Sequence, residues 1–277
     1  MINKVVFATF VIAAIYYLMA AVALHCFLSA LIFVKVPVST THETQRYQVE
    51  HAGASAVIRA YISAHESGCA LFFPGQHGGI DGYETPLFTP LNARGISVYA
   101  ISYPGYEGAK GSASFANVLT LTQSAVAFIE QMSSCRIAES VFIGRSLGAA
   151  IALENALVQP PKALLLDGVA ASLAGAIRQK FSANMLLKPL QLLPVESLLQ
   201  FELELTQQLS QLHDVAVVIF QGDQDQRTPL TALLLAVTSH PQLDLNAIKG
   251  GIHADAWLKA GPLYFDKLCQ QIRCAAP

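Results

Sequence analysis

The longest apolar stretch of the chain runs from Val5 to Val34 and contains no Asp, Glu, Lys or Arg. It covers 30 residues between Lys4 and Lys35, whereas a bilayer span needs roughly 20. The pattern predicts a membrane helix, and we place an N-terminal anchor at residues 1–34. A signal peptide is the alternative, because Lys4 and the small residues Ala21-Val22-Ala23 fit one. The apolar stretch continues well past those alanines, which favours an anchor that is not cleaved.

Residues 35–277 alternate between short, continuous apolar runs and longer segments with helical spacing. Strands that are apolar on both faces are buried on both faces, as in a parallel sheet covered by helices. The runs lie at 70–73, 98–101, 141–143, 163–166 and 215–220, with a further short run at 243–248. Helical spacing marks 115–129, 147–158, 229–238 and 257–272. The alternation predicts one domain with an α/β fold, a mostly parallel central sheet and helices on both faces.

Two segments depart from this alternation. Residues 47–63 show a period of two and predict one or two antiparallel edge strands joined near Gly53. Residues 170–213 lack a strand pattern, are rich in leucine and are interrupted by Pro189 and Pro194. We expect a helical cap insertion over the carboxyl end of the sheet. Its leucines either only pack the insertion down or line an apolar substrate pocket under a lid.

Composition and charge exclude several classes of protein. Of the 277 residues, 53% are hydrophobic and 13% are charged, and a chain this apolar is not disordered. With 17 Lys and Arg against 19 Asp and Glu, the net charge is −2, which argues against a nucleic-acid partner. The 5 cysteines include no C-x-x-C pair, and we expect mostly free thiols. The segment from His65 to Cys69 lacks a second pair of ligands, so we expect no metal site.

The sequence Gly144-Arg145-Ser146-Leu147-Gly148 follows the apolar run at 141–143 and opens the helix predicted at 147–158. This is the G-x-S-x-G pattern in the strand–turn–helix context that gives it meaning. The turn must hold the serine hydroxyl clear of the sheet, and a Cβ at either flanking glycine would strike the neighbouring strand or helix. Ser146 is therefore the candidate nucleophile.

A serine hydroxyl needs a general base that is oriented by an acid. His253 follows a pair of glycines after the run at 243–248 and is the candidate base. Asp225 lies in the loop after the run at 215–220 and is the candidate acid. Asp223 lies in the same loop, where we expect it to cap the turn or contact backbone amides. Asp167, at the end of the preceding predicted strand, stays open as an alternative acid.

Acyl transfer passes through a tetrahedral oxyanion, which needs two preorganised N–H donors. The amide of Leu147, next to the nucleophile, is one candidate. The other should come from the loop after the first buried strand, Pro74-Gly75-Gln76-His77-Gly78-Gly79, where Gln76 is the best candidate. An ordinary glycine-rich turn is the alternative interpretation of this loop.

These pieces resemble the α/β-hydrolase superfamily over residues 47–272, and more narrowly its branch with a single N-terminal membrane span. The resemblance is carried by Phe73-Pro74-Gly75-Gln76, Tyr103-Pro104-Gly105-Tyr106, Gly144–Gly148, Gly222–Pro229 and Gly251-Ile252-His253. That branch usually reads His-Gly-Asn in the first motif and Asp-Tyr-Arg-Gly-Tyr-Gly in the second. In this chain Pro74 replaces the histidine, Ser102 the aspartate, Pro104 the arginine and Glu107 the final glycine. The departures affect residues that shape the site and therefore bear on substrate preference.

The resemblance implies cleavage of acyl esters or thioesters, including monoacylglycerols and lipidated proteins, without a cofactor. We therefore expect a membrane-anchored serine hydrolase that acts on lipophilic acyl substrates through Ser146, His253 and Asp225. A binding module of the same fold, without catalysis, is the alternative.

The side of the membrane on which the domain lies follows only weakly from charge. Lys4 and the amino terminus lie on one side of the anchor and Lys35 and Arg46 on the other, so the balance gives no clear direction. A very short tail left inside is common for such anchors, which favours a domain that faces outward.

Overall fold

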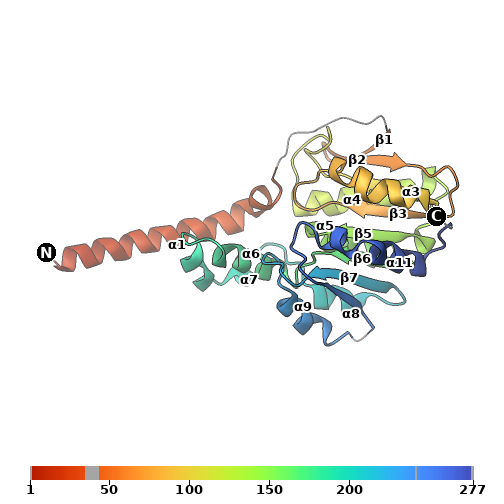
Figure 1. The fold of residues 1–277 in the computed structure, drawn as a ribbon. Coiled ribbons are helices and arrows are strands. Elements are labelled where there is room, and N and C mark those ends of the chain that lie inside the picture. The colour runs from red at the N-terminus through yellow and green to blue at the C-terminus, as the bar shows by residue number, and fades with distance from the viewer. Residues whose placement is uncertain (1, 35–43, 241, 276–277) are drawn as a thin grey trace.

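The fold consists of one eight-stranded sheet with helices on both faces, from which a long N-terminal helix projects (Figure 1). A computed structural model describes residues 2–34, 44–240 and 242–275. The strands are β1 Gln45–His51, β2 Ala54–Tyr61, β3 Gly68–Phe73, β4 Ile96–Ile101, β5 Val141–Arg145, β6 Ala163–Asp167, β7 Ala216–Gly222 and β8 Asp244–Ile248. Their order is β1-β2-β4-β3-β5-β6-β7-β8. Only β1–β2 and β2–β4 are antiparallel pairs, so the predicted mostly parallel sheet is confirmed.

The central strands are buried along almost their whole length, because helices cover both faces of the sheet. Every residue of β4, β5 and β6 is buried, and these strands contain the continuous apolar runs of the sequence. Strand β1 is mostly exposed at the edge. It turns into β2 through Ala52 and Gly53, which have positive φ angles of 48° and 78°. The structure therefore has a hairpin turn where the sequence predicts one.

Two layers of helices flank the sheet. The helices are α1 Ile2–Ile32, α2 Asp81–Tyr83, α3 Thr89–Ala93, α4 Phe115–Met132, α5 Leu147–Val158, α6 Leu173–Ser182, α7 Val195–Leu198, α8 Leu205–Gln211, α9 Leu230–Val237, α10 Ala256–Ala260 and α11 Pro262–Gln271. Three shorter turns are η1 Glu84–Phe88, η2 Ile137–Glu139 and η3 Lys188–Leu192. Apolar residues of α4, α5 and α8 form the core on one face. Apolar residues of η1, α3, α10 and α11 form a second core on the other face.

The segment between β6 and β7 contains α6, η3, α7 and α8 and makes up the helical cap that the sequence predicts. Its base is tied together by backbone hydrogen bonds from Leu173 N to Leu203 O and from Leu205 N to Ala171 O, both 2.9 Å long. In Figure 1, α6 and α7 lie beside α1, away from the sheet. The cap therefore connects the sheet to the N-terminal helix.

Helix α1 has an exposed first half and a second half that packs on the cap. Its residues from Lys4 to Ile15 are exposed, whereas Tyr17, Ala21 and Leu24 contact the core at helical spacing. Among the described residues, Lys4–Ile32 is the one helix long and apolar enough to span a bilayer. The proposed boundary between anchor and domain, at residues 34 and 35, borders a segment outside the described residues, which includes Lys35.

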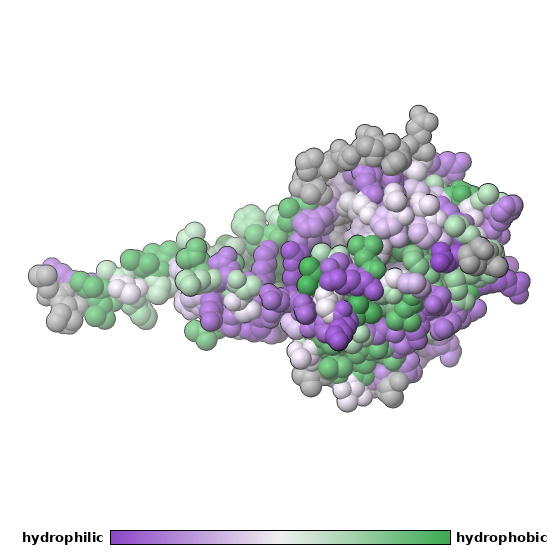
Figure 2. All heavy atoms as spheres, viewed as in Figure 1, coloured by the Kyte–Doolittle hydropathy of each residue, from purple (hydrophilic) through white to green (hydrophobic). Residues whose placement is uncertain are grey.

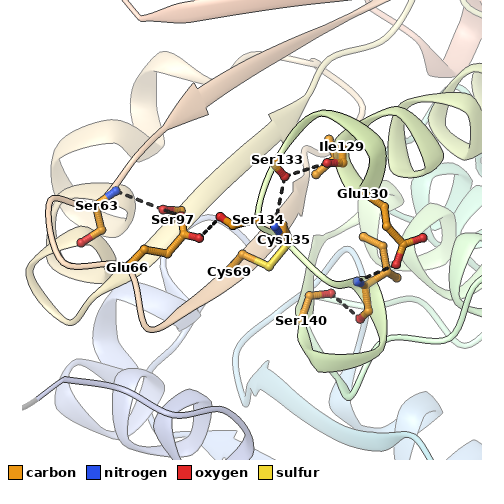
Figure 3. The surroundings of a disulfide bond; sticks show 11 residues. Ser63, Glu66, Cys69, Ser97, Ile129, Glu130, Ser133, Ser134, Cys135 and Ser140 are labelled. Atoms are coloured by element: carbon orange, nitrogen blue, oxygen red, sulfur yellow. Dashed lines mark hydrogen bonds between the residues drawn. A yellow bond between two sulfur atoms is a disulfide. The ribbon is translucent and has the colours of Figure 1, made fainter.

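The expectation of mostly free thiols is wrong. Cys69 is bonded to Cys135, with Cα atoms 5.7 Å apart, and Cys269 to Cys274, with Cα atoms 5.3 Å apart, which leaves Cys26 as a free, exposed thiol in the described part of the chain. Figure 3 shows the first bond between β3 and the turn that follows α4. The two cysteines are 66 residues apart in sequence, and only the packing of α4 on the sheet brings them together.

The first disulfide is expected to stabilise the fold more than the second, because it closes a longer loop. Under the chain-entropy relation, Cys69→Ala with Cys135→Ala should lower the free energy of unfolding by about 4 kcal/mol, and Cys269→Ala with Cys274→Ala by about 2 kcal/mol. Guanidinium denaturation in detergent measures both losses. A thiol count on the unfolded, unreduced wild type should give one free thiol; a count of five would contradict the pairing.

Candidate active site

The candidate nucleophile lies on the turn between β5 and α5, at the carboxyl edge of the sheet. Ser146 has φ of 53° and ψ of −118°, a conformation that residues other than glycine rarely adopt. A Cβ on Gly144 would lie 2.5 Å from Cα of Ala149, and a Cβ on Gly148 would lie 2.0 Å from the carbonyl oxygen of Phe73. Only glycine fits at either position, as the sequence pattern predicts.

The structure brings Ser146, His253 and Asp225 together. The Nε2 atom of His253 is 2.9 Å from Oγ of Ser146. The Nδ1 atom of the same ring is 2.8 Å from Oδ2 of Asp225. With the proton on Nδ1, the ring donates to the carboxylate and presents Nε2 to the serine hydroxyl as an acceptor. This is the geometry in which a histidine can take the proton from a serine.

The carboxylate of Asp225 is buried and surrounded by donors. The backbone amides of Arg227 and Thr228 donate to its Oδ1 over 2.8 and 2.9 Å, and the Thr228 hydroxyl donates to Oδ2 over 2.7 Å. Burial opposes ionisation of Asp225, but the hydrogen bonds from His253 and Thr228 outweigh it and hold the pKa of Asp225 below its usual range. An ionised carboxylate therefore faces the imidazole at neutral pH.

Asp167, the alternative acid, lies at the end of β6 beside a different partner. Its Oδ2 is 3.1 Å from Nη1 of Arg145, and no hydrogen bond in the described part of the chain joins it to His253. Burial raises the pKa of Asp167 to about 7, opposed by Arg145 and reinforced by the negative charge of Asp225. Arg145 also donates to the backbone carbonyl of His253. The geometry therefore favours Asp225 as the partner of the imidazole and leaves Asp167 to support the loop below it.

Asp223 lies in the same loop as Asp225 but makes a backbone contact instead. Its Oδ1 accepts a hydrogen bond of 2.7 Å from the amide of Gly250. This contact links the loop after β7 to the loop after β8. The second loop carries His253, three residues after Gly250. Asp223 thus has the role that we expected from the sequence, a contact with a backbone amide.

The two candidate oxyanion donors lie beside the nucleophile. Gln76 and Leu147 both line the cavity in front of Ser146. The loop that carries Gln76 runs close to the nucleophile, because a Cβ on Gly75 would lie 3.5 Å from Cβ of Ser146. Two tyrosines hold this loop. The Tyr103 hydroxyl donates to Pro74 O over 2.6 Å, and the Tyr106 hydroxyl donates to Gln76 O over 3.1 Å.

The departures from the family motif have local explanations in the structure. Ser102 donates to Gly78 O over 3.3 Å, a bond that an ionised aspartate could not make. Glu107 has a positive φ of 51°, a conformation that glycine adopts most easily. Its carboxylate lies 3.3 Å from buried Arg59 and 3.4 Å from Arg46. These ion pairs give Glu107 a structural role.

A cavity of about 130 Å³ opens in front of Ser146. Three apolar residues of α6, Leu173, Ala176 and Ile177, form much of its wall. Leu31 and Ile32, at the end of α1, form another part. The cavity therefore lies where the nucleophile turn, the cap and the N-terminal helix meet.

Several residues around the site were not identified from the sequence. Thr228 contacts Nδ1 of His253 over 3.2 Å and donates to Asp225, and it lies in the predicted acid loop. Arg145 is part of the nucleophile motif, but at a position that the motif leaves open. The sequence does not indicate that α1 contributes to the cavity. The helix is apolar on all sides, so its pattern does not show which residues face the domain.

Comparison with known proteins agrees with the fold. A family model described as "Alpha/beta hydrolase family" matches residues 70–268. An uncharacterized protein of Mycobacterium tuberculosis is 27% identical over 206 residues, which cover 73% of this chain and 69% of that protein. An alpha-beta hydrolase from Vibrio vulnificus has a TM-score of 0.66 at 15% identity and covers 83% of this chain and 81% of its own. An alpha-beta serine hydrolase homologue from Coxiella burnetii has a TM-score of 0.57 at 15% identity, over 84% and 99% of the two chains.

Proposed function

Because the chain belongs to the α/β hydrolase family, we propose that it is a membrane-anchored serine hydrolase that cleaves carboxylic ester or thioester bonds of lipophilic acyl substrates. One observation carries this proposal. The hydrogen-bonded series Asp225–His253–Ser146 ends at an apolar cavity beside the nucleophile. Each polar group in the series has a partner that suits one role in acyl transfer.

The first half of the reaction acylates the serine. Oγ of Ser146 attacks the acyl carbonyl carbon, and its proton moves to Nε2 of His253. The carbonyl electron pair moves onto oxygen, where the amides of Gln76 and Leu147 donate to the oxyanion. The intermediate then collapses, the bond to the leaving alcohol or thiol breaks, and Nε2 returns its proton to the leaving group. Asp225 stabilises the imidazolium that exists between the two transfers.

The second half releases the acid. Water attacks the acyl carbonyl while Nε2 of His253 takes its proton, and the same two amides bind the new oxyanion. When this intermediate collapses, the bond between the acyl carbon and Oγ breaks and Ser146 recovers its proton. No step requires a cofactor or a metal ion.

The preference for a lipophilic acyl group rests on the wall of the cavity. Apolar side chains of α6 and α1 face the space in front of Ser146, and burying each methylene of an acyl chain contributes about 0.8 kcal/mol. Among the described residues of the lining, Lys180 is the one that carries a charge. An acyl chain is thus a better occupant than a charged or strongly hydrated group.

The proposed location is a membrane surface, with α1 as a single span and the domain on the outer side. The length and apolar composition of α1 support the anchor. The two disulfides support the side, because disulfides persist in oxidising compartments and are rare in reducing ones.

The nucleophile is tested with a fluorophosphonate probe on the full-length protein. Wild type should label, and Ser146→Ala should not, because the probe reacts with an activated serine hydroxyl. Ser172→Ala is the matched control, since Ser172 lines the same cavity but caps α6; it should label like wild type. A folded wild-type protein that stays unlabelled would favour the non-catalytic binding module.

The acid is tested by exchanging the two buried aspartates separately. Asp225→Asn should lower kcat about 10³- to 10⁴-fold, because asparagine no longer favours the productive tautomer of the histidine. Asp167→Asn should lower it less than about tenfold, because it removes an ion pair beneath the histidine loop and no direct contact with the ring. Steady-state kinetics on a p-nitrophenyl ester measure both. A larger loss for Asp167→Asn would reverse the assignment.

The acyl preference is tested with p-nitrophenyl esters of increasing chain length in detergent. Wild type should prefer long acyl chains. Ala176→Phe narrows the cavity and should lower kcat/KM for a long-chain ester about tenfold, while the acetyl ester changes less than about twofold. Ala183→Phe, which follows α6 at an exposed position, should behave like wild type. A wild type that hydrolyses the acetyl ester best would count against a lipophilic substrate.

A further inference from the structure

The far end of the cap carries three large apolar side chains that the described part of the chain leaves uncovered. This cap tip comprises residues 184–192 and includes the turn after α6 and the short helix η3. Met185, Leu186 and Leu192 are 88%, 79% and 83% exposed. Single exposed apolar residues are common, but three on one short segment mark a surface that contacts another apolar phase.

The cap tip is fixed to α1. The Tyr16 hydroxyl donates to Leu186 O, and the Tyr17 hydroxyl donates to Pro189 O over 2.8 Å. Residues 4–15 of α1, before these tyrosines, are exposed in the described part of the chain and project beyond the cap (Figure 2). The tip is therefore attached to the middle of the helix, far from the end that leads into the domain.

This attachment fixes the depth of the tip. At 1.5 Å per residue, Tyr16 and Tyr17 lie about 18 and 20 Å along the helix from Lys4, and the hydrocarbon core is about 30 Å thick. With Lys4 at one boundary, both tyrosines lie about 10 Å inside the opposite boundary. Tilting the helix only brings them deeper. If α1 spans the bilayer, the cap-tip backbone at Leu186 and Pro189, which these tyrosines contact, lies in the same leaflet as the tyrosines.

The charge pattern of the segment suits this position. Between Asp167 and Glu196 the chain has no acidic residue but contains Arg178, Lys180 and Lys188. Lys180 and Lys188 are exposed. Long lysine side chains can bury their apolar stems and extend their ammonium groups to the lipid headgroups, and basic residues near a bilayer are attracted to anionic lipids.

We propose that the cap tip inserts into the hydrocarbon of the leaflet on the domain side, beside α1, with phospholipid acyl chains covering Met185, Leu186 and Leu192. This inference rests on the proposed membrane anchor and extends it, because the protein then holds the bilayer at two places. The occupant of the exposed apolar surface is the lipid that would also surround α1, because Tyr16 and Tyr17 hold the tip against that helix.

Insertion of the tip determines how substrate reaches Ser146. Leu31 and Ile32 line the cavity and lie about 40 Å along α1 from Lys4, near the level of the headgroups. The part of the cavity wall that α1 and α6 form thus lies just above the leaflet that the tip enters. A lipid can move its acyl carbonyl into the cavity while much of its chain stays in the bilayer, without complete transfer through water.

A depth measurement on the full-length protein tests the insertion. In a Cys26→Ser background, single cysteines at Leu192→Cys, Phe10→Cys and Val158→Cys are labelled with an NBD fluorophore, with both disulfides intact. The proteins are reconstituted in vesicles of phosphatidylcholine and phosphatidylglycerol with or without doxyl groups on the acyl chains. Phe10, 72% exposed on α1, is the reference for the anchor; Val158, 64% exposed at the end of α5, is the apolar control away from the cap.

Doxyl lipid should quench the labels at positions 10 and 192 about twofold or more and leave the label at 158 unchanged, because acyl-chain quenchers act only on groups within the hydrocarbon. Quenching at position 10 without quenching at position 192 would overturn the cap-tip proposal and leave the anchor standing. No quenching at position 10 would overturn both. Neither result affects labelling of Ser146 by a fluorophosphonate, so failure of the hydrolase proposal is seen separately.

A kinetic comparison tests the consequence. Leu192→Glu should lower the rate on a long-chain ester embedded in vesicles about tenfold, because a carboxylate enters hydrocarbon at a high cost. Its rate on a short, water-soluble ester should stay at the wild-type value, since Leu192 does not line the cavity. Val158→Glu should match wild type on both substrates. Equal rates of Leu192→Glu and wild type on embedded ester would contradict insertion of the tip.

Discussion

The site depends on one backbone constraint, the positive-φ turn at Ser146. Strand β5 must turn into α5 within one residue. This sharp turn brings Gly148 close to the backbone of β3 and Gly144 close to the backbone of α5. The parallel sheet then positions the other two residues of the site. The loops after β7 and β8 end at the same edge as β5, which places an acid and a histidine within reach of the hydroxyl although they lie far away in sequence.

This logic explains which parts of the fold and site could be predicted. Apolar runs, glycine pairs and strand ends can be recognised locally in the sequence. The parallel topology then places the residues that follow the strands at one edge of the sheet. The same logic could not separate Asp225 from Asp167, because both follow neighbouring strands of that edge. The two aspartates differ in their partners. Asp167 lies 3.1 Å from the guanidinium of Arg145, whereas Asp225, after the next strand, contacts the ring of His253.

The features that the sequence did not reveal are contacts between surfaces of distant elements. Cys69 and Cys135 meet only because α4 packs against the sheet, and a count of five cysteines carries no information on that packing. Arg59 has a comparable explanation. Its side chain is buried in β2 because the segments after β3 and β4 cover it with the carboxylates of Asp81 and Glu107. Burial of a charge is acceptable there because oppositely charged groups surround it.

The relation between helix α1 and the cavity distinguishes this arrangement from a simple tether. A flexible tether would raise the local concentration of a hydrolase near lipid but leave its active site free to face any direction. Here α1 packs along the cap from Tyr16 onward and ends with Leu31 and Ile32 in the cavity wall. The proposed anchor and the proposed substrate site therefore share side chains, so the orientation of the helix in a bilayer also sets the height and direction of the cavity. Under the proposed function, we expect a change that repacks α1 to alter catalysis even when Ser146, His253 and Asp225 are untouched.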